Sequence, residues 1–368
     1  MTNSSMLSPR ALNRALLARQ MLLERERMTA VDAIARLVGL QAQMPRPPFV
    51  GLWTRLIDFR RAELASALHD RAVVRVTAMR GTLHIMTTAD YIGMRGVLQP
   101  MLSKGTLSIL RGRGADLDID ALDAEARRFF ATKGATFDAL RNHLKAMNPK
   151  GDERALAYAI RTHVPLVQVP TDATWAFPAA ADFALADRWL SKKVSTKATS
   201  VEALVRRYLA AFGPATPADA QAWSGMAGLR ETFETLRPSL VTFRDARKRE
   251  LFDLPDAPRP DEATPAPVRF VPDFDNIVLS HDDRTRIMAD EHRSRVTLKN
   301  LQVRATFLVD GFVAGTWKSE RKRKAAVLLI EPFGAVAKKT RAALEQEGEL
   351  LLEFLEEDAT EREVRWAS

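Results

Sequence analysis

The sequence contains no cysteine among its 368 residues. This absence excludes disulfides, thiolate zinc sites, cysteine nucleophiles and the usual iron–sulfur clusters. The six histidines form no HExxH or HxxxH pair, and neither a Walker phosphate loop nor a GxGxxG motif occurs. We therefore expect no cofactor, no nucleotide and no histidine-rich metal site, although carboxylates could still hold magnesium. Any chemistry has to rely on other side chains.

Long apolar runs are also missing from the chain. No uninterrupted stretch approaches the roughly 18 apolar residues needed to span a bilayer. Residues 1–6 lack the basic segment and hydrophobic core of a secretory signal. These absences predict a cytoplasmic protein with no membrane partner. The length allows several units, because domains commonly contain about 100–200 residues.

Charge is distributed unevenly along the chain. The formal net charge is +9 and the pI is near 9.9, which favours a polyanionic partner. The stretch from Arg71 to Arg113 contains seven basic residues and one acidic residue. The stretch from Arg293 to Lys324 contains nine basic and two acidic residues. Residues 343–363 carry nine acids and one arginine, which is typical of a solvated acidic helix or tail. The two basic regions predict nucleic-acid contact, with general solubility as the alternative.

The N-terminal part has the pattern of a winged helix, in which helices are followed by a strand pair. Ser8 is the expected N-cap of the first helix and is followed by a first-turn proline. Apolar spacing predicts further helices over residues 31–38 and 62–69. Strands are expected over residues 73–76 and 82–86.

The clearest copy of this pattern lies between Val201 and Pro255. An apolar helical stripe stops at Gly213, Thr216 supplies an N-cap, and Gly225 marks a tight turn. The expected elements are helices over 201–212, from 217 and around 229–236, and strands over 240–243 and 250–252.

A weaker third copy lies between these two. Thr136 opens one helix, Glu153 opens another that ends near His163, and residues 164–169 are strand-like. Trp175 would lie at or after the tip of this wing. The middle of the chain is therefore interpreted as a further winged helix.

The C-terminal part follows a linker at residues 257–267 that contains four prolines. Strands are expected over 303–309, 312–317 and 325–330, and helical periodicity then returns. We therefore predict a mainly α protein with a small β content, made of three tandem winged helices and a small C-terminal β-barrel or sheet with a helix. The expected domains are residues 1–115, which include the candidate catalytic motif, 116–198, 199–256 and 257–368.

Two glutamines one residue apart mark the candidate active site, in the segment LQAQMPR at residues 40–46. Pro45 disfavours a helical conformation at Met44, so the preceding helix should end before it. Side chains alternate along an extended segment, so Gln41 and Gln43 would point the same way. The two carboxamides would then converge on one point. The alternative is that they cap helix carbonyls or line a polar loop.

Seven stretches that span most of the chain resemble one family. They are residues 7–14, 40–43, 79–84, 212–216, 273–277, 280–284 and 311–317. In them the sequence resembles the AlkZ-like winged-helix DNA glycosylases, a family associated with unhooking interstrand crosslinks. In that family a Gln-x-Gln pair is the catalytic motif, and a sister branch carries Gln-x-Asp. Gln41 and Gln43 match the first pattern, and no carboxylate is present at residue 43.

The resemblance implies a DNA glycosylase that acts on alkylated purines, including N7-alkylguanine and bulky or crosslinked adducts. A carboxamide is no general base near neutral pH, but a cationic alkylated base already leaves readily. The remaining tasks are to position water and to stabilise charge on the sugar, which fixed amide dipoles can do. We assign Gln43 to the water and Gln41 to the sugar or the water, with the two roles exchangeable. No lysine lies in the motif, which favours a monofunctional enzyme over a lyase.

Further residues are candidates for contact with double-stranded DNA. Arg46 and Arg75 could hold phosphate near the site, and Arg80 and His84 either flank a DNA groove or satisfy the wing internally. Trp53, Trp175 and Trp317 are interpreted mainly as core or interface residues. A basic hairpin offers backbone contacts without sequence discrimination. Its candidate residues are Trp317, Lys318, Arg321, Lys322 and Arg323.

Two alternatives to a glycosylase are a noncatalytic winged-helix DNA-binding protein or transcription regulator, and an interaction scaffold. Salt-dependent DNA binding would separate the scaffold from the other two. We expect a monomer that is associated with the nucleoid when it is bound to DNA.

Overall fold

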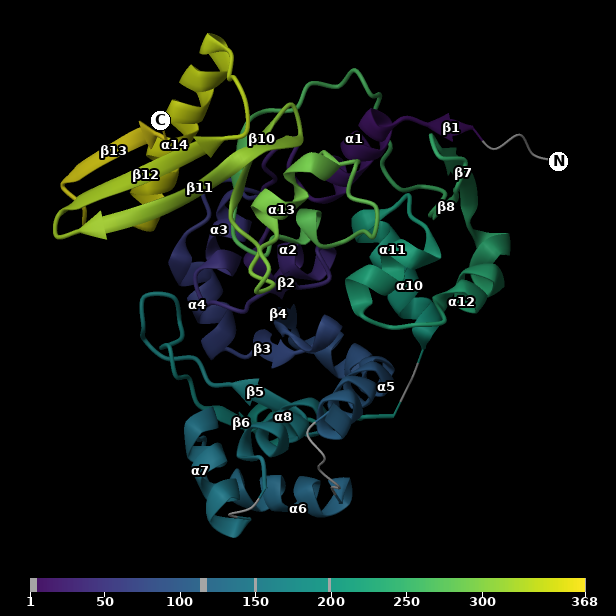
Figure 1. Ribbon diagram of the computed structural model, residues 1–368, viewed down its shortest axis with the longest axis vertical. Coiled ribbons are helices and arrows are strands. Elements are labelled where there is room, and N and C mark those ends of the chain that lie inside the picture. The colour runs from purple at the N-terminus through teal and green to yellow at the C-terminus, as the bar shows by residue number, and fades with distance from the viewer. Residues whose placement is uncertain (1–4, 113–117, 149–150, 198–199, 368) are drawn as a thin grey trace.

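The computed structural model describes residues 5–112, 118–148, 151–197 and 200–367, with the side chains of 109–112 left out (Figure 1). Arg113 and the expected domain boundaries at 115–116 and 198–199 lie outside the described residues. Helices surround three separate β-sheets. Among the described helices, none combines the length and the apolar character required to cross a bilayer.

The N-terminal helices begin where the sequence predicts. The Ser8 hydroxyl accepts the Ala11 N–H at 3.0 Å and caps a helix whose first residue is Pro9. One helix was not foreseen, a short one that begins directly after Arg46. The helices of this part are α1 (Pro9–Arg19), α2 (Ala30–Arg36), α3 (Pro47–Trp53) and α4 (Arg61–His69).

The strands expected after these helices form an antiparallel hairpin, but they belong to a larger sheet. The sheet has the order β2-β4-β3-β5-β6, and β3 pairs with β5 from the middle of the chain. The first and second expected units therefore share one sheet. Its strands are β2 (Leu40–Gln41), β3 (Val73–Thr77), β4 (Leu83–Thr87), β5 (Leu166–Gln168) and β6 (Phe183–Leu185), and the turn η1 (Met79–Gly81) joins β3 to β4.

Five helices accompany the sheet in the middle of the chain. Thr136 caps one of them by accepting the Ala139 N–H at 3.1 Å, as the sequence predicts. A long helix from Thr88 contains Pro100 and was not foreseen. These helices are α5 (Thr88–Gly112), α6 (Ile119–Phe129), α7 (Phe137–Met147), α8 (Glu153–His163) and α9 (Ala186–Leu190).

The third region matches its expected elements closely. Thr216 and Asp219 form a capping box, and Gly225 ends the second helix with a φ of +81°. The two strands pair antiparallel, and β1 (Met6–Leu7) joins their sheet. The other elements are α10 (Val201–Phe212), α11 (Pro217–Ser224), α12 (Leu229–Leu236), the turn η2 (Arg237–Ser239), β7 (Val241–Asp245) and β8 (Glu250–Asp253). The organisation into three winged helices itself stays a prediction.

The C-terminal part is an open sheet covered by a helix, so the barrel alternative is corrected. The sheet has the order β13-β12-β11-β10-β9, and its two edge strands do not pair with each other. The acidic stretch forms helix α14 and part of an unforeseen edge strand, β13. The elements are β9 (Arg269–Val271), η3 (Asn276–Val278), η4 (Asp290–His292), α13 (Arg293–Val296), β10 (Thr306–Val309), β11 (Phe312–Lys322), β12 (Ala325–Pro332), α14 (Lys338–Leu355) and β13 (Glu361–Trp366).

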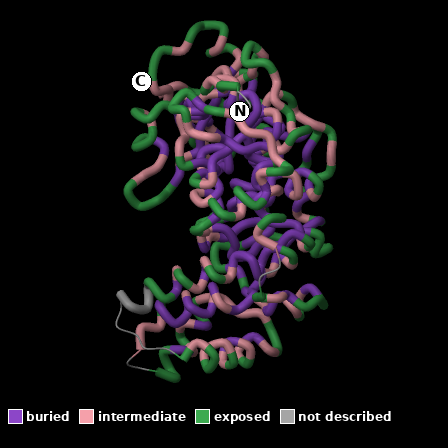
Figure 2. The backbone as a smooth tube through the Cα atoms, turned by 90° about the vertical axis from the view of Figure 1, so that its right-hand side faces the viewer, coloured by how far each residue is buried: buried purple, intermediate pink, exposed green. Residues whose placement is uncertain are grey.

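The largest hydrophobic core joins segments that are distant in the sequence. It contains residues of α1, β3, α5 and α10 to α12, together with residues 271–313. Buried residues are concentrated in the interior of the molecule, whereas exposed residues lie along its edges (Figure 2). A separate core lies between α14 and the C-terminal sheet. The segment with the two glutamines begins in the edge strand β2 of the central sheet, and its last residue, Arg46, bonds to Ser319 of the C-terminal sheet.

Candidate active site

The two glutamines lie at the edge of the central sheet. Gln41 is the last residue of β2 and is opposite His84 of β4, and the Ala42 N–H continues the pairing with the Leu83 carbonyl at 2.7 Å. Gln41 is only 7% exposed, whereas Gln43 is exposed. The segment after Gln41 is non-helical, as Pro45 predicts.

The Gln41 side chain is held by a buried cation. Arg80 Nη2 donates a hydrogen bond to Gln41 Oε1 at 2.6 Å, and Nη1 of the same guanidinium bonds to the Trp223 carbonyl. Because a guanidinium only donates, the Gln41 oxygen has to face Arg80 and its NH₂ group is turned away. Burial, with a smaller effect of Arg284, lowers the pKa of Arg80 to about 10. Arg80 is therefore still a cation at neutral pH.

Gln43 is held much less firmly. Its Oε1 accepts the Leu83 N–H at 3.4 Å, which is long for a hydrogen bond. Both carboxamide oxygens thus contact the segment 80–83, one through a side chain and one through the backbone. The exposed Gln43 amide can bind a solvent molecule without breaking a strong internal bond.

Arg75 fixes the backbone that carries both glutamines. Its guanidinium donates to the Ala42 carbonyl at 2.9 and 2.7 Å and to the Gln43 carbonyl at 3.2 Å. It also lies 4.8 Å from the ring centroid of Phe177. Burial lowers the pKa of Arg75 to about 10. The Arg75 cation therefore fixes the backbone of residues 42 and 43 through these hydrogen bonds.

The segment 273–277 supports the same loop from another side. Asn276 Nδ2 donates to the Gly39 carbonyl at 2.8 Å, two residues before Gln41. The adjacent Asp275 accepts from Arg55 at 2.8 and 2.9 Å, and both of these side chains are fully buried. Sequence reasoning matched this segment to a family but gave Arg55 and Asn276 no role. The available signal was an Asp-Asn pair between apolar residues.

His84 is the cross-strand neighbour of Gln41 and is 1% exposed. Its Nδ1 lies 3.1 Å from the Thr82 carbonyl oxygen. Burial, and then the charge of Arg80, lowers the pKa of His84 from 6.5 to about 3. His84 is therefore neutral at physiological pH, so it is no proton donor there, and its low pKa makes it a poor base.

The pKa of His84 predicts a loss of stability in acid. The unfolded chain binds a proton near pH 6.5 and the folded chain only near pH 3, so the stability falls as the pH drops between these values. Between pH 7 and 5.5, His84 should account for about 1 kcal/mol of this loss. Urea unfolding at both pH values should show that His84→Gln removes this part of the loss. The control is His69→Gln, whose side chain is 44% exposed, and an unchanged pH dependence in His84→Gln would contradict the prediction.

Three residues expected to contact DNA are buried instead. Arg75, His84 and Trp317 are 3%, 1% and 4% exposed. Trp317 Nε1 donates to the Val271 carbonyl at 3.0 Å inside the C-terminal core, so the indole offers no face to a base. Arg75 and His84 use their polar atoms within the central sheet. Direct DNA contact by these three residues stays a prediction, and their burial does not favour it.

The other expected DNA contacts are at the surface or partly buried. Arg46 Nη1 donates to the Ser319 hydroxyl at 2.9 Å and thereby joins the glutamine segment to β11. Lys318 pairs with Glu320 at 2.8 Å. The Arg321 guanidinium contacts two carboxylates near the end of α14, at 3.3 and 3.1 Å. Lys322, the last residue of β11, and Arg323, in the turn that follows it, are exposed.

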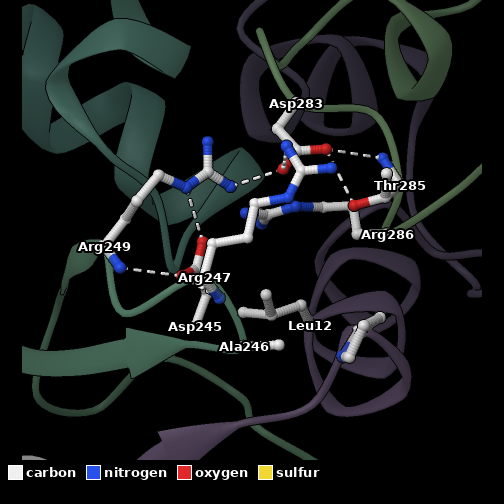
Figure 3. Close-up of a pocket in the computed structure, with 9 residues that line it drawn as sticks. Leu12, Asp245, Ala246, Arg247, Arg249, Asp283, Thr285 and Arg286 are labelled. Atoms are coloured by element: carbon white, nitrogen blue, oxygen red, sulfur yellow. Dashed lines mark hydrogen bonds and ion pairs between the residues drawn. The ribbon is translucent and has the colours of Figure 1, made fainter. Parts of the chain in front are cut away.

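A cavity of about 240 Å³ lies apart from the glutamines, between α1, the β7–β8 turn and residues 283–286 (Figure 3). Arg247, Arg249 and the two carboxylates of its lining are paired with one another, and Arg286 donates to the Pro214 carbonyl at 2.7 Å. Asp283 accepts from Arg249 at 2.5 Å and lies 3.2 Å from Arg247, and Asp245 accepts from Arg249 at 2.7 Å. These ion pairs join the β7–β8 turn to residues 283–286, so we assign the cavity a structural role. Among the described residues, no group of three or more histidine and carboxylate side chains is placed to hold a metal.

Comparisons with known proteins identify the class. The chain matches the family described as DNA glycosylase AlkZ-like over residues 34–354. It is 25% identical over 356 residues to the interstrand DNA cross-link repair glycosylase of Streptomyces sahachiroi, covering 89% of this chain and 91% of that protein. Its fold is similar to that of the Streptomyces sahachiroi DNA glycosylase AlkZ, with a TM-score of 0.79 and 21% identity over 98% of this chain and 100% of that chain.

The match and the shared fold define a DNA glycosylase, a hydrolase that cleaves N-glycosyl bonds in DNA. The chain belongs to the AlkZ-like DNA glycosylase family, since the family match covers most of its length.

Substitutions of two glycines between α11 and α12 can test whether close packing against residue 225 holds Arg80 in place. An added Cβ at Gly225, with φ +81°, would lie 3.0 Å from the Arg80 Cα, whereas at Gly228, with φ +77°, it would meet nothing within 4 Å. Gly228→Ala should cost about 1–2 kcal/mol through its backbone conformation alone. Gly225→Ala should cost about 1–3 kcal/mol more and reduce base release about tenfold, because Arg80 is displaced from Gln41. Equal stability and activity of the two variants would contradict this prediction.

Proposed function

We propose that this enzyme hydrolyses the N-glycosidic bond of cationic N-alkylated purines in double-stranded DNA. The substrates would include N7-alkylguanine and bulky or interstrand-crosslinked adducts. The observation that carries the proposal is the pair of neutral carboxamides at the edge of the central sheet, on a backbone segment held by Arg75 and with the Gln41 oxygen bonded to Arg80. The crosslink assignment is supported by the name of the Streptomyces sahachiroi relative.

Neutral catalytic groups are sufficient because the positive charge of the alkylated base already makes it a good leaving group. The electron pair of the glycosidic bond passes to the base, which leaves as a neutral molecule. The sugar then carries oxocarbenium-like charge until water attacks its C1′ and loses a proton to solvent. Such a reaction needs an oriented water and fixed dipoles more than it needs a strong base. The neutral state of His84 agrees with this requirement.

The two glutamines differ in their bonding, which supports different roles. Gln43 is exposed and its oxygen makes only a long contact, so we assign it to the attacking water. Gln41 turns its oxygen to Arg80, so its NH₂ group remains to orient the water or the DNA backbone. We therefore propose a donor role for Gln41, whereas the sequence left open whether Gln41 faces the sugar or the water.

We also propose that the enzyme is a monomer, is monofunctional and needs no cofactor. A lyase forms a covalent bond to the sugar through an amine. The segment 40–46 contains no lysine, and the cations that contact it, Arg75 and Arg80, are guanidiniums bonded to carbonyl oxygens.

The turn between β11 and β12 supports contact with the DNA backbone. Lys322 and Arg323 are exposed, and no ion pair involves them within the part of the chain that the structure describes. Each phosphate contact contributes about one unit to the slope of log affinity against log salt. The double variant Lys322→Ala/Arg323→Ala should therefore lower this slope by up to about two, as measured by fluorescence anisotropy. Lys338→Ala/Lys339→Ala on α14 is the matched control, and equal slopes would exclude the turn from the DNA interface.

The decisive experiment is to incubate the protein with duplex DNA that contains one N7-alkylguanine or a nitrogen-mustard-type crosslink. Release of the free base and formation of alkali-labile sites would support the proposal. DNA binding without release from either lesion, at enzyme in excess over DNA, would overturn it and favour a noncatalytic DNA-binding regulator.

A further inference from the structure

A cleft of about 610 Å³ lies between helix α5 and the turn that joins α11 to α12. This volume is within the range of about 300–1,000 Å³ that is typical of small-ligand sites. Lys104 and Ser108 of α5 line the cleft and are exposed, so a ligand can reach both side chains. Arg80 also lines it and is partly buried.

The cleft lies on the face of the central sheet to which the Gln41 side chain points. In the register Gln41 is opposite His84, and His84 is opposite Val76, so these side chains share one face. Val76 belongs to the core that also contains residues of α5 and α11, and Met101 and Met226 of the cleft pack against that core. The turn η1, which carries Arg80, contacts both α5 and α11. The cleft and Gln41 are therefore joined by one residue, Arg80.

The cleft carries positive charge that the surrounding residues do not balance. Lys104 forms no ion pair with the part of the chain that the structure describes, and the described lining of the cleft contains no carboxylate. The Arg80 guanidinium bonds to Gln41 and to the Trp223 carbonyl, which are both uncharged. After burial, the effect that lowers the pKa of Arg80 is the charge of Arg284, another cation. A cleft with this charge attracts an anion.

The lining suits the sugar–phosphate backbone of DNA. Lysine side chains and serine hydroxyls are among the groups that bind phosphate in protein–DNA complexes. Lys104 and Ser108 are four residues apart in α5 and are therefore neighbours on its surface. Pro100, Met101 and Met226 provide apolar surface for a deoxyribose.

We propose that this cleft binds one phosphate of the DNA strand that carries the lesion, through Lys104 and the Ser108 hydroxyl. The inference rests on the proposed function, which places the glycosidic bond beside Gln41. Arg80 bonds to Gln41, so a cation lies next to the sugar on which positive charge develops. The phosphate offsets this cation, because opposite charges attract strongly where little water separates them. The DNA thus supplies a negative charge that neither glutamine can provide.

The first experiment measures binding to a duplex with one tetrahydrofuran abasic site, by fluorescence anisotropy. Lys104→Met should raise the Kd about tenfold and lower the slope of log affinity against log salt by about one, as expected for one lost phosphate contact. Lys339→Met on exposed α14 is the control and should change neither quantity.

A series of such duplexes, each with one neutral methylphosphonate, locates the contact. At one position beside the abasic site, the unaltered protein should lose affinity about tenfold, and Lys104→Met should bind that duplex equally well. This loss of affinity needs no variant, so a folding defect cannot cause it. The position dependence distinguishes a bound phosphate from general attraction between the protein and DNA.

Two glycines of α5 test the cleft itself. An added Cβ at Gly105 would lie 4.0 Å from the Tyr158 hydroxyl, and at Gly93 it would meet nothing within 4 Å, so both positions have room for a side chain. Gly105→Leu places its side chain in the cleft and should raise the Kd about tenfold by excluding the backbone. Gly93→Leu lies outside the cleft and should leave the Kd unchanged.

Two results would overturn the phosphate site. They are an effect of Lys104→Met that is the same for every methylphosphonate position, and equal affinities of Gly105→Leu and Gly93→Leu. Single-turnover base release from N7-alkylguanine DNA separates this inference from the proposed function. Release that Lys104→Met leaves unchanged would reject the cleft and leave the proposed function intact. A position-specific phosphate contact without any base release would reject the proposed function and leave the phosphate site.

Discussion

Replacing Gln43 by alanine should lower the rate of base release from N7-alkylguanine DNA by about 10²–10³-fold, the usual effect of removing one fixed polar group from an active site. Gln41→Ala should lower it by a similar factor. DNA affinity should stay within about twofold, because phosphate contacts dominate it. Single-turnover release of the free base, measured with enzyme in excess, separates this chemical step from binding.

Gln41→Ala and Gln43→Ala should differ in stability, because Gln41 bonds to a buried cation and Gln43 makes only a long contact. Gln41→Ala leaves Nη2 of the buried Arg80 guanidinium without its acceptor and should cost about 1–3 kcal/mol. Gln43→Ala removes only a long, exposed contact and should cost less than about 0.5 kcal/mol. Gln346→Ala on the surface of α14 is the control for both. Full base release by Gln43→Ala would remove that residue from the mechanism.

Local features of the fold could be predicted from the sequence because short-range chemistry determines them. Ser8, Thr136 and Thr216 each cap a helix, because the hydroxyl accepts the backbone N–H three residues further on. Gly225 ends a helix at a position that needs a positive φ. The hairpin β3–β4 is also local. By contrast, the pairing of β3 with β5 joins Arg75 to Gln168, and no local pattern encodes a partner so distant in the sequence.

The candidate site was only partly predictable for the same reason. The pattern of glutamines beside Pro45 located the segment and its extended backbone. It could not show that Arg75 would turn inward to bind carbonyls, because a lone arginine in a strand has the same sequence signature on the surface. Trp317 alternates with exposed Lys318 on β11, and only the position of α14 shows which face is buried.

The buried pair of Arg55 and Asp275 should have the largest effect on stability. Arg55→Met leaves the Asp275 carboxylate fully buried and without its cation, which should cost about 3–5 kcal/mol. Arg55 also donates to the Gly51 carbonyl at 2.8 Å, so two elements loosen together. Urea unfolding at pH 7 measures the change in free energy. The fraction that stays folded should release base more slowly, because Asn276 loses its hold on Gly39.

An exposed ion pair provides the control for this experiment. Arg27 and Asp58 are 3.3 Å apart and about three-quarters exposed, so Arg27→Met should cost less than about 1 kcal/mol. The double variant Arg55→Met/Asp275→Leu removes both buried charges and should recover part of the stability lost in Arg55→Met. If instead Arg55→Met costs no more than Arg27→Met, the pair does not hold residues 273–277 against the glutamine segment. The support of the site then has to come from Arg75 and Arg80 alone, since these two cations bond directly to residues 41–43.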